Sequence, residues 1–275
     1  SHDARIAAIE EGGGQYVVVA DGRVVEYSVC GSTLPDATVL VSAYVAGCLM
    51  PTLSSHTEAL ERLNIRYITI SFPSLGHSSP QFGHCVADWP ETDLLPVLEA
   101  EGVDVPFCFW GGSLGAHYAM AVATHPLTQD RVSALGLRVP YLPRPLSNEL
   151  GLKQGQPSLP KSEEVQANTG KVKMWRKMLL SSVSFLAEYD PEGPGRWAAF
   201  KRWLMGHGLM GAEGRQFHDL ARDHRPIFEY MRGMCDHFGP DAMLHEMAED
   251  TALDSEVDPR NIPNVGNTVV WYAAD

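Results

Sequence analysis

Short apolar runs alternate with helix-like segments over the first half of the chain. The apolar runs occupy residues 38–43, 67–72, 105–110 and 134–139, and each is typical of a strand covered on both faces. The segments between them that are typical of helices span 54–63, 88–100, where Pro96 is a local flaw, and 116–124. Strands that alternate with helices predict an α/β fold, a mostly parallel sheet with helices on both faces and functional groups at the carboxyl ends of its strands.

An antiparallel hairpin is predicted ahead of this repeating pattern. Two β-branched runs, 16–19 and 24–29, flank Asp21-Gly22. Asp-Gly between such runs is a strong signal for a tight hairpin turn. We therefore expect the sheet to begin with an N-terminal β-hairpin.

The pattern changes after Tyr141, because no convincing strand occurs until about residue 261. A loop at 151–170, rich in Gly, Gln, Pro, Ser and Lys, leads into amphipathic segments. These predicted helices span 174–189, 196–205, 217–234 and 241–249, and an apolar strand follows at 268–272. The expected organisation is an α/β core over 1–143 and 262–275, with a helical cap inserted at 144–261.

The sequence around Ser113 carries the clearest chemical motif. Gly111-Gly112-Ser113-Leu114-Gly115 has the form Gly-x-Ser-x-Gly and joins an apolar strand to a helix, which is the order of a nucleophile elbow. A Cβ at position 111 or 115 would collide with the neighbouring strand or helix, and a negative oxygen formed at Ser113 would meet the Leu114 N–H and the helix dipole. The alternative is a glycine-rich turn that holds an inert serine.

Two other glycine-rich motifs are excluded. A dinucleotide-binding fingerprint needs glycine where Trp110 stands, and a phosphate-binding loop needs Gly-Lys-Ser/Thr, which the chain lacks.

Charge and cysteine content narrow the classes of partner and compartment. The chain has 34 acidic and 21 basic residues, a net charge of −13, which argues against nucleic acid and anionic membranes as partners. It contains no apolar run of about 18 residues, so we expect no membrane-spanning helix, and its opening segment does not have the form of a signal peptide. The odd number of cysteines, without metal-type spacing, favours free thiols in a reducing compartment such as the cytoplasm or an organelle interior, with Cys108 buried in a strand. The cysteines are Cys30, Cys48, Cys85, Cys108 and Cys235.

Three segments resemble the α/β-hydrolase fold, with the elbow in its expected place. Residues 25–31 are similar to that family's opening strand, 73–78 to its Gly-x-Gly-x-Ser loop, and 271–275 to the strand that leads to its catalytic acid. The resemblance covers nearly the whole chain and implies an α/β-hydrolase fold without its last strand and helix.

The resemblance also implies roles for individual residues. Ser113 matches the nucleophile. Asp275 matches the acid if Tyr272 occupies the place of the glycine that ends the family's strand. If Ala273 occupies that place instead, the acid is residue 276. The backbone N–H groups of Leu114 and Val45 match the oxyanion hole, with Tyr44-Val45 in place of the family's His-Gly. The catalytic histidine should follow the acid, but the last histidine is His245, so the chain as given lacks it. Either the base lies beyond residue 275, or the protein has none.

The other histidines carry alternative interpretations. His77 lies in a loop expected to face the site, where it is either a recruited base or a structural residue. For His117 and His125, packing or surface roles are expected. His77, His84 and Cys85 match no standard metal spacing, so neither a metal nor a cofactor is expected.

Residues of the predicted cap are also open to two interpretations. A basic cluster either steers an anionic substrate or acidic partner, or is a solvated helix face. Its members are Lys171, Lys173, Arg176 and Lys177. Large apolar side chains either line an acyl pocket or pack the cap. They are Met174, Trp175, Met178, Trp197, Trp203 and Met205.

Two functions follow from these residues. The first is a serine hydrolase of a small carboxylic ester or acyl substrate, with Ser113 as nucleophile and the cap controlling access. The second is a non-catalytic binding module or structural subunit with the same fold, whose open C-terminal sheet edge is covered by a protein partner.

Overall fold

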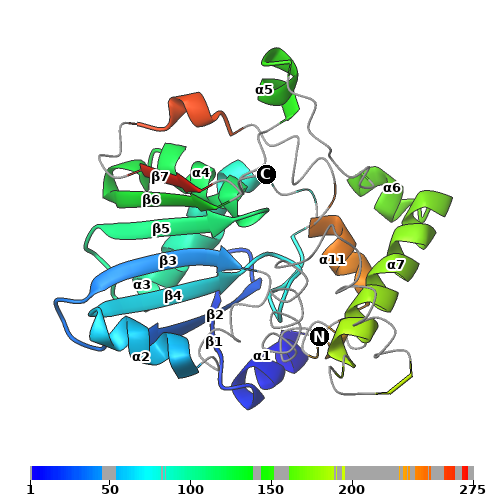
Figure 1. Ribbon diagram of the computed structural model, residues 1–275, viewed down its shortest axis with the longest axis horizontal. Helices are drawn as coiled ribbons and strands as arrows, with labels where there is room; N and C mark the ends of the chain where they lie inside the picture. The colour runs from blue at the N-terminus through cyan, green and yellow to red at the C-terminus, as the bar shows by residue number, and fades with distance from the viewer. Residues whose placement is uncertain are drawn as a thin grey trace. The chain divides into compact units, whose positions relative to one another are not determined.

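The described residues form a seven-stranded sheet in the order β1-β2-β4-β3-β5-β6-β7 (Figure 1). The strands are β1 Gln15–Val18, β2 Val24–Gly31, β3 Thr38–Tyr44, β4 Ile65–Ser71, β5 Phe107–Gly112, β6 Val132–Arg138 and β7 Thr268–Trp271. β1 and β2 pair antiparallel, as do β2 and β4, and all later neighbours pair parallel. The predicted hairpin and mostly parallel sheet are both confirmed.

The computed structural model describes most of the first half of the chain and parts of the second. The described residues are 2–44, 54–81, 83, 85–138, 144–151, 161–188, 190, 194–195, 229, 232–233, 235, 239–246, 248, 257–263 and 268–271. The chain divides into two compact units, 1–172 with 241–275, and 173–240. The cap boundaries at residues 144 and 261 stay a prediction.

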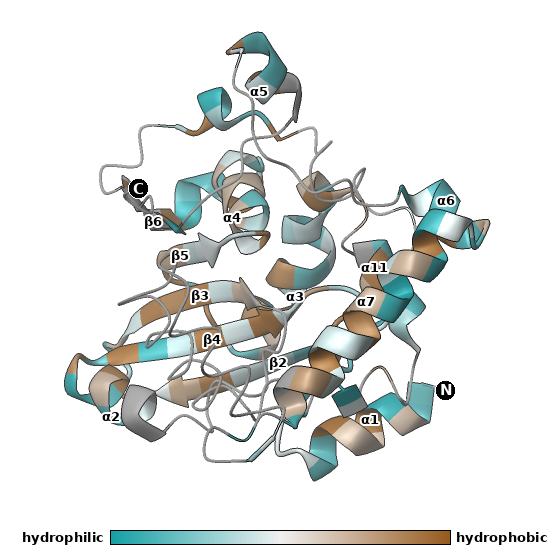
Figure 2. Ribbon diagram, turned by 45° about the vertical axis from the view of Figure 1, so that its right-hand side comes forward, coloured by the Kyte–Doolittle hydropathy of each residue, from teal (hydrophilic) through white to brown (hydrophobic). Residues whose placement is uncertain are grey.

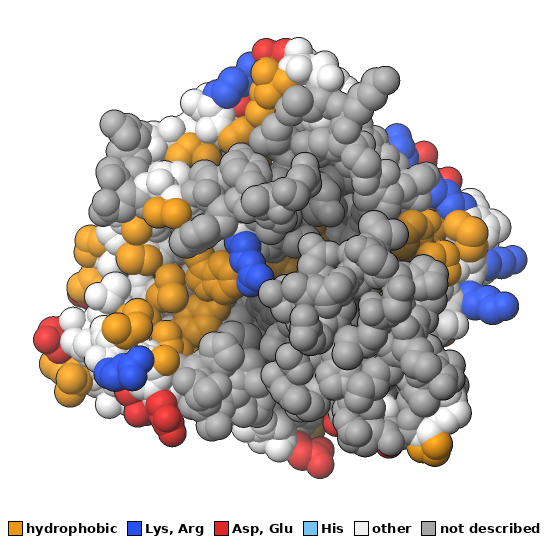
Figure 3. Space-filling model, in the orientation of Figure 1, with side chains coloured by type: hydrophobic (Ala, Val, Ile, Leu, Met, Phe, Trp, Pro, Cys, Tyr) orange, Lys and Arg blue, Asp and Glu red, His pale blue; other side chains and the backbone are white. Residues whose placement is uncertain are grey.

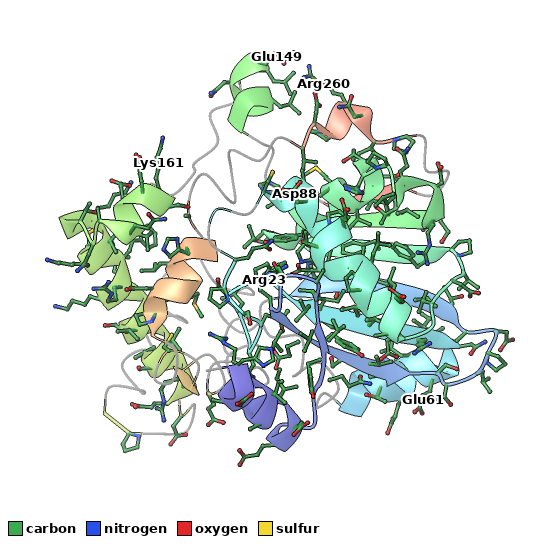
Figure 4. All side chains as sticks on the ribbon, turned by 180° about the vertical axis from the view of Figure 1, so that it is seen from behind. Arg23, Glu61, Asp88, Glu149, Lys161 and Arg260 are labelled. Carbon is green, nitrogen blue, oxygen red and sulfur yellow. The ribbon has the colours of Figure 1, made fainter. Side chains whose placement is uncertain are left out.

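Helices lie on both faces of the sheet (Figures 1 and 4). α2 (Ser54–Arg62) packs on β2 and β4, whereas α4 (Gly115–Thr124) packs on β3, β5 and β6 on the opposite face. Hydrophobic residues run along the strands between them (Figure 2). In β5 the buried Phe107 and Phe109 face α4, and the half-buried Cys108 and Trp110 alternate with them. Cys108, which we expected to be buried, is therefore half-exposed, because no described helix covers it as α4 covers Phe109.

The face of β3, β5 and β6 that points away from α4 carries apolar side chains near the surface (Figure 3). Leu40, Cys108 and Ala134 share it through the β3–β5 and β5–β6 registers, and each is partly exposed. Val269, in the neighbouring β7, is 46% exposed. The expectation that a protein partner covers the C-terminal edge of the sheet, at β7, stays a prediction.

The helix expected at 88–100 is present but irregular. A 3₁₀ turn, η2 (Val86–Asp88), is followed by a π-helical segment, η3 (Pro90–Leu94), and then by α3 (Leu95–Ala100). Proline has no N–H to donate to the carbonyl four residues earlier, so Pro96 interrupts the regular hydrogen-bond pattern. The wider π turn directly before it accommodates this break.

The N-terminal helix was not anticipated from the sequence. The helices at 144–149 and 162–166 were not anticipated either, and the second lies within the segment 151–170 that the sequence predicts as a loop. α1 (His2–Glu11) packs on β1 and β2 and buries Ile9. Its apolar residues do not line one face, so helical periodicity gave no signal. Arg5 in α1 donates to the Ser78 carbonyl at 2.9 Å, which joins this helix to the loop after β4.

The remaining described elements are short, apart from one long helix. They are η4 Gln129–Arg131, α5 Arg144–Glu149, α6 Ser162–Gln166, α7 Gly170–Ala187, α11 Pro240–Glu246 and η5 Pro259–Asn261. α7 begins four residues before the predicted helix and carries alternating apolar and polar patches (Figure 2). The helices predicted at 196–205 and 217–234 fall almost entirely outside the described residues. No helix among the described residues has the length and apolar character needed to cross a bilayer.

An aromatic cluster fills the core between α4 and the sheet. Phe72 and Tyr118 stack with ring centroids 4.5 Å apart, and Trp89 meets Tyr118 edge-on at 5.2 Å. All three side chains are almost completely buried. Their burial stabilises the strand–helix junction that follows β5, because α4 cannot shift without opening this cluster.

A buried ion pair ties the hairpin to the helical segment beneath it (Figure 4). Arg23 donates to both carboxylate oxygens of Asp93, at 2.7 and 3.3 Å, and to Asp21 at 2.7 Å. The Asp93 side chain is fully buried, whereas that of Asp21 is 52% exposed. Arg23 thus has one desolvated and one hydrated partner.

Asp93→Ala should lower the free energy of unfolding by about 3 kcal/mol, because it leaves a mostly buried guanidinium without its buried partner. Asp21→Ala is the matched control, since it removes the exposed partner of the same arginine and should cost less than about 1 kcal/mol. Urea denaturation measures both values. Equal losses in the two variants would contradict the assignment of the Asp93 pair as the stabilising one.

Candidate active site

Ser113 stands at a sharp turn between β5 and α4. Its φ is +53°, a left-handed conformation that is rare for serine, and its side chain is exposed. The Ser113 N–H donates to the Arg138 carbonyl at 3.0 Å, and the Ser113 carbonyl accepts from the Ala116 N–H at 3.1 Å. The surrounding strand and helix thus hold a strained backbone and present the hydroxyl at the carboxyl ends of the strands.

The flanking glycines permit this turn by letting two backbones approach closely. A Cβ on Gly111 would lie 2.0 Å from the Gly115 carbonyl oxygen, far inside contact distance. A Cβ on Gly115 would lie 3.0 Å from the Ala43 carbonyl at the end of β3. The structure therefore bears out the predicted reason for both glycines, more strongly at position 111.

Leu114 lies where the sequence predicts an oxyanion donor, and that role stays a prediction. It precedes α4 with helical φ and ψ, so its N–H lies at the positive end of that helix. Among the described residues, the Leu114 N–H donates to no backbone carbonyl. This group can donate to a negative oxygen that forms beside Ser113.

A cavity of about 220 Å³ adjoins the Ser113 hydroxyl. It lies where β3, β5 and β6 end, a position that follows from the parallel order of these strands. Its lining residues are Ser42, Ala43, Trp110, Gly111, Gly112, Ser113 and Arg138. The space suits a small molecule or the end of a larger one.

Beneath this cavity is a buried polar network. The Tyr67 hydroxyl accepts from Trp110 Nε1 at 3.0 Å and lies 2.7 Å from Ser42 Oγ. Burial raises the pKa of Tyr67 above its ordinary value, so its hydroxyl stays neutral at physiological pH. The network orients the Trp110 ring, which forms part of the cavity wall.

His77 pairs with a buried carboxylate. Its Nδ1 lies 3.0 Å from Glu26 Oε1, its backbone N–H donates to Glu26 Oε2 at 2.9 Å, and Ser71 Oγ donates to the same oxygen at 2.8 Å. Gly76, with φ +59°, makes room for the pair, because a Cβ there would lie 2.0 Å from Glu26 Oε2. Burial by itself would raise the pKa of Glu26, but the hydrogen bonds and charge of His77, with the Ser71 bond, hold it below its ordinary value.

The structure describes only some of the predicted site residues. Ser113 and Leu114 both lie in the described turn between β5 and α4, and their catalytic roles stay predictions. Val45 and Asp275 lie outside the described residues, so their roles stay predictions, as does that of His84 beside Cys85. Cys85 itself is a half-buried free thiol, and the described part of the chain contains no cluster of three potential metal ligands.

His117 and His125 lie at positions that suit packing. His117 is 1% exposed within α4, and the His125 ring lies 4.0 Å from the Glu91 carboxylate just after that helix. In the basic cluster, Lys171 pairs with Glu164 at 3.1 Å, while Lys173 and Lys177 are exposed. Met174 and Met178 are each about half exposed, and Trp197, Trp203 and Met205 lie outside the described residues.

A larger cavity, about 680 Å³, lies at the opposite ends of the parallel strands. Its charged pair is already neutralised, because Arg66 donates to both the Glu101 carboxylate and the Glu101 carbonyl. The thiol among its described lining residues, Cys30, is not activated, because burial raises its pKa. Size alone would favour this cavity, but the chemistry favours the smaller one beside Ser113.

Sequence reasoning missed Arg138, Ser42 and the Glu26–His77 pair. Arg138 had a weak signal, because it is a charged residue near the end of the apolar run at 134–139. Ser42 and Glu26 lie within apolar strands, and only the pairing of distant strands shows what their side chains meet.

Gly111→Ala should destabilise the protein by about 3 kcal/mol, because its methyl group would overlap the Gly115 carbonyl. Gly112→Ala is the matched control one residue along, where the nearest atoms would be 3.6–3.7 Å away, so its stability should change by less than about 1 kcal/mol. Thermal and urea unfolding test the pair. Equal tolerance at both positions would contradict the elbow geometry.

The lowered pKa of Glu26 predicts a loss of stability in acid. An unfolded glutamate has a pKa of about 4.3, so the contribution of Glu26 is fully present above that pH and is lost as pH falls through the lower folded value. Glu26→Gln should therefore be less stable at pH 7 and show a shallower decline between about pH 5 and pH 3. Glu61→Gln, at an exposed position of α2 (Figure 4), should keep the wild-type slope. Parallel curves for wild type and Glu26→Gln would refute the prediction.

The chain resembles known proteins in its structure. No protein-family model matches the chain, and no curated protein sequence matches it. The enol-lactonase from Burkholderia xenovorans LB400 matches with a TM-score of 0.54 and 16% identity, over 93% of this chain and 80% of that one. Est816, described as an N-acyl homoserine lactone degrading enzyme, matches over the same shares with a TM-score of 0.53 and 16% identity.

A third match is the bromoperoxidase from Bacillus anthracis, with a TM-score of 0.50 and 15% identity over 93% of this chain and 80% of that one. At sequence identities of 15–16%, these matches show a similar path of the backbone. It agrees with the strand order and the strand–turn–helix at Ser113. The chain therefore has the α/β-hydrolase fold.

Proposed function

We propose that this protein is a serine hydrolase that cleaves a small carboxylic ester or related acyl substrate, with Ser113 as nucleophile. The observation that carries the proposal is the exposed Ser113 hydroxyl at a strained φ of +53°, beside a cavity and the start of α4. A strained backbone persists only where the surrounding structure enforces it, and such positions cluster at active sites. A merely structural serine in this turn would need neither the strain nor the exposure.

The chemistry assigned to the site is acyl transfer. Ser113 Oγ attacks the acyl carbon as its proton passes to a base, and the carbonyl oxygen becomes an oxyanion that accepts from the Leu114 N–H. Collapse of this intermediate expels the alcohol with a proton and leaves an acyl-serine. Water then attacks the acyl carbon, releases the acid and restores the Ser113 hydroxyl. Within this proposal Val45 supplies the second oxyanion donor, and Asp275 or the next residue orients the base.

Two of the matching structures are described as an enol-lactonase and as an N-acyl homoserine lactone degrading enzyme. A lactone is a cyclic carboxylic ester, so its hydrolysis needs the same nucleophile and oxyanion donors. These descriptions support an ester-type substrate by fold-level analogy alone, whereas the assignment of Ser113 itself rests on its own geometry.

A non-catalytic binding module is the second candidate. Among the described residues, no histidine forms a hydrogen bond with Ser113 Oγ, and His77 is engaged by Glu26. A serine without a base loses most of its reactivity, since the catalytic residues act as a unit. The two candidates therefore differ in whether Ser113 reacts.

A fluorophosphonate probe should label Ser113 in the folded protein, as mapped by peptide mass spectrometry. Ser113→Gly, which tolerates the positive φ, should abolish labelling and lower kcat for ester hydrolysis at least about 10³-fold. Ser133→Ala is the control, because this exposed serine lies at the other end of β6. A well-folded protein that shows neither labelling nor hydrolysis would favour the binding module.

A further inference from the structure

Arg138 lies directly beside the Ser113 turn. It is the last residue of β6, it pairs with Gly112 of β5, and its carbonyl accepts from the Ser113 N–H at 3.0 Å. Neighbouring strands are about 4.8 Å apart, so the Arg138 backbone lies within one strand spacing of the elbow. Among the described residues that line the Ser113 cavity, Arg138 alone carries a charge.

The strand register leaves open space between Arg138 and Trp110. Trp110 pairs with Gly136, and Gly112 pairs with Arg138, so the four residues share one face of the sheet. The two glycines have no side chains to fill that face. A Cβ placed on Gly112 would lie 3.6 Å from the Trp110 ring and 3.7 Å from Arg138 Cβ. The aromatic ring and the arginine therefore flank a gap beside the nucleophile.

The charge of Arg138 is not neutralised by the described residues. Arg23, Arg66 and Arg260 each donate to a carboxylate, whereas the exposed Arg138 has no ion pair with any described side chain. The chain has 34 acidic residues against 21 basic ones, so carboxylates are abundant. An arginine that lines a cavity without such a partner is suited to bind an anion from solution.

We propose that Arg138 binds a carboxylate on the substrate, so that the preferred substrates are short esters or lactones that carry a free carboxylate. The guanidinium presents paired donors that match the two oxygens of a carboxylate. Because the Arg138 backbone borders Ser113 and Arg138 lines the same cavity, we place the anion a few bonds from the scissile carbonyl. The inference rests on the proposed reaction of Ser113 for its substrate class, but the anion site itself can be tested without that reaction.

The net charge of −13 does not oppose this assignment. Repulsion between an anionic substrate and distant carboxylates is screened within about 8 Å at physiological ionic strength. The field inside the cavity is therefore dominated by the adjacent cation. Rising salt should weaken the preference for anionic substrates, because Arg138 is exposed.

The kinetic test compares monoethyl succinate with ethyl 4-oxopentanoate, in which a neutral acetyl group replaces the carboxylate. The ratio of kcat/KM for the anionic over the neutral ester should fall about 10- to 100-fold in Arg138→Gln. Arg138→Lys should retain part of the preference for the anionic ester, since lysine keeps the positive charge but lacks the paired donors of the guanidinium. Arg62→Gln removes an exposed arginine from the last turn of α2 and should leave the ratio unchanged.

The binding test uses Ser113→Gly and the matching amides, N-ethylsuccinamate and N-ethyl-4-oxopentanamide, in calorimetric titrations. The anionic amide should bind at least about 10-fold more tightly, and adding Arg138→Gln should abolish the difference. This result supports the anion site even if the protein hydrolyses no ester, in which case only the proposed reaction fails. Equal binding of the two amides, or a preference that survives Arg138→Gln, overturns the inference.

Discussion

The close approach of Gly111 to Gly115 is the contact on which the site depends. The end of β5 and the start of α4 touch backbone to backbone, at a distance that leaves no room for a side chain on Gly111. This contact forces the reversal of direction at Ser113 and its positive φ. The stacked Phe72 and Tyr118 hold α4 from behind, so the strain at Ser113 is stabilised by burial of apolar surface elsewhere in the core.

The strand order converts this local turn into a site. Because β3 lies between β4 and β5, the ends of β3, β5 and β6 become neighbours although they are far apart in the sequence. Ala43 reaches Gly115 from one side, and Arg138 accepts the Ser113 N–H from the other. Ser113, the N-terminus of α4 and Arg138 in the cavity wall therefore share one edge of the sheet.

Polar groups inside the core have different tasks on the two sides of β3. On the β2–β4 side, Glu26, Ser71 and His77 satisfy one another and fix the loop after β4. A second network crosses β3 toward β5, where Tyr67 of β4 holds Ser42 of β3 and Trp110 of β5 beneath the cavity. In both places burial without hydrogen bonds would be costly, so each network specifies the position of the loop or ring that it holds.

Local chemistry in the sequence determined the elements and the turn at Ser113. Asp21-Gly22 encodes its hairpin, the apolar runs encode buried strands, and Gly-x-Ser-x-Gly encodes the turn, because each depends on residues close together in the chain. Only the tertiary structure decided that Arg138 borders Ser113, that His77 pairs with Glu26, and that Pro96 follows a π turn. These contacts depend on the register of distant strands and on packing against them, which periodicity along one chain does not contain.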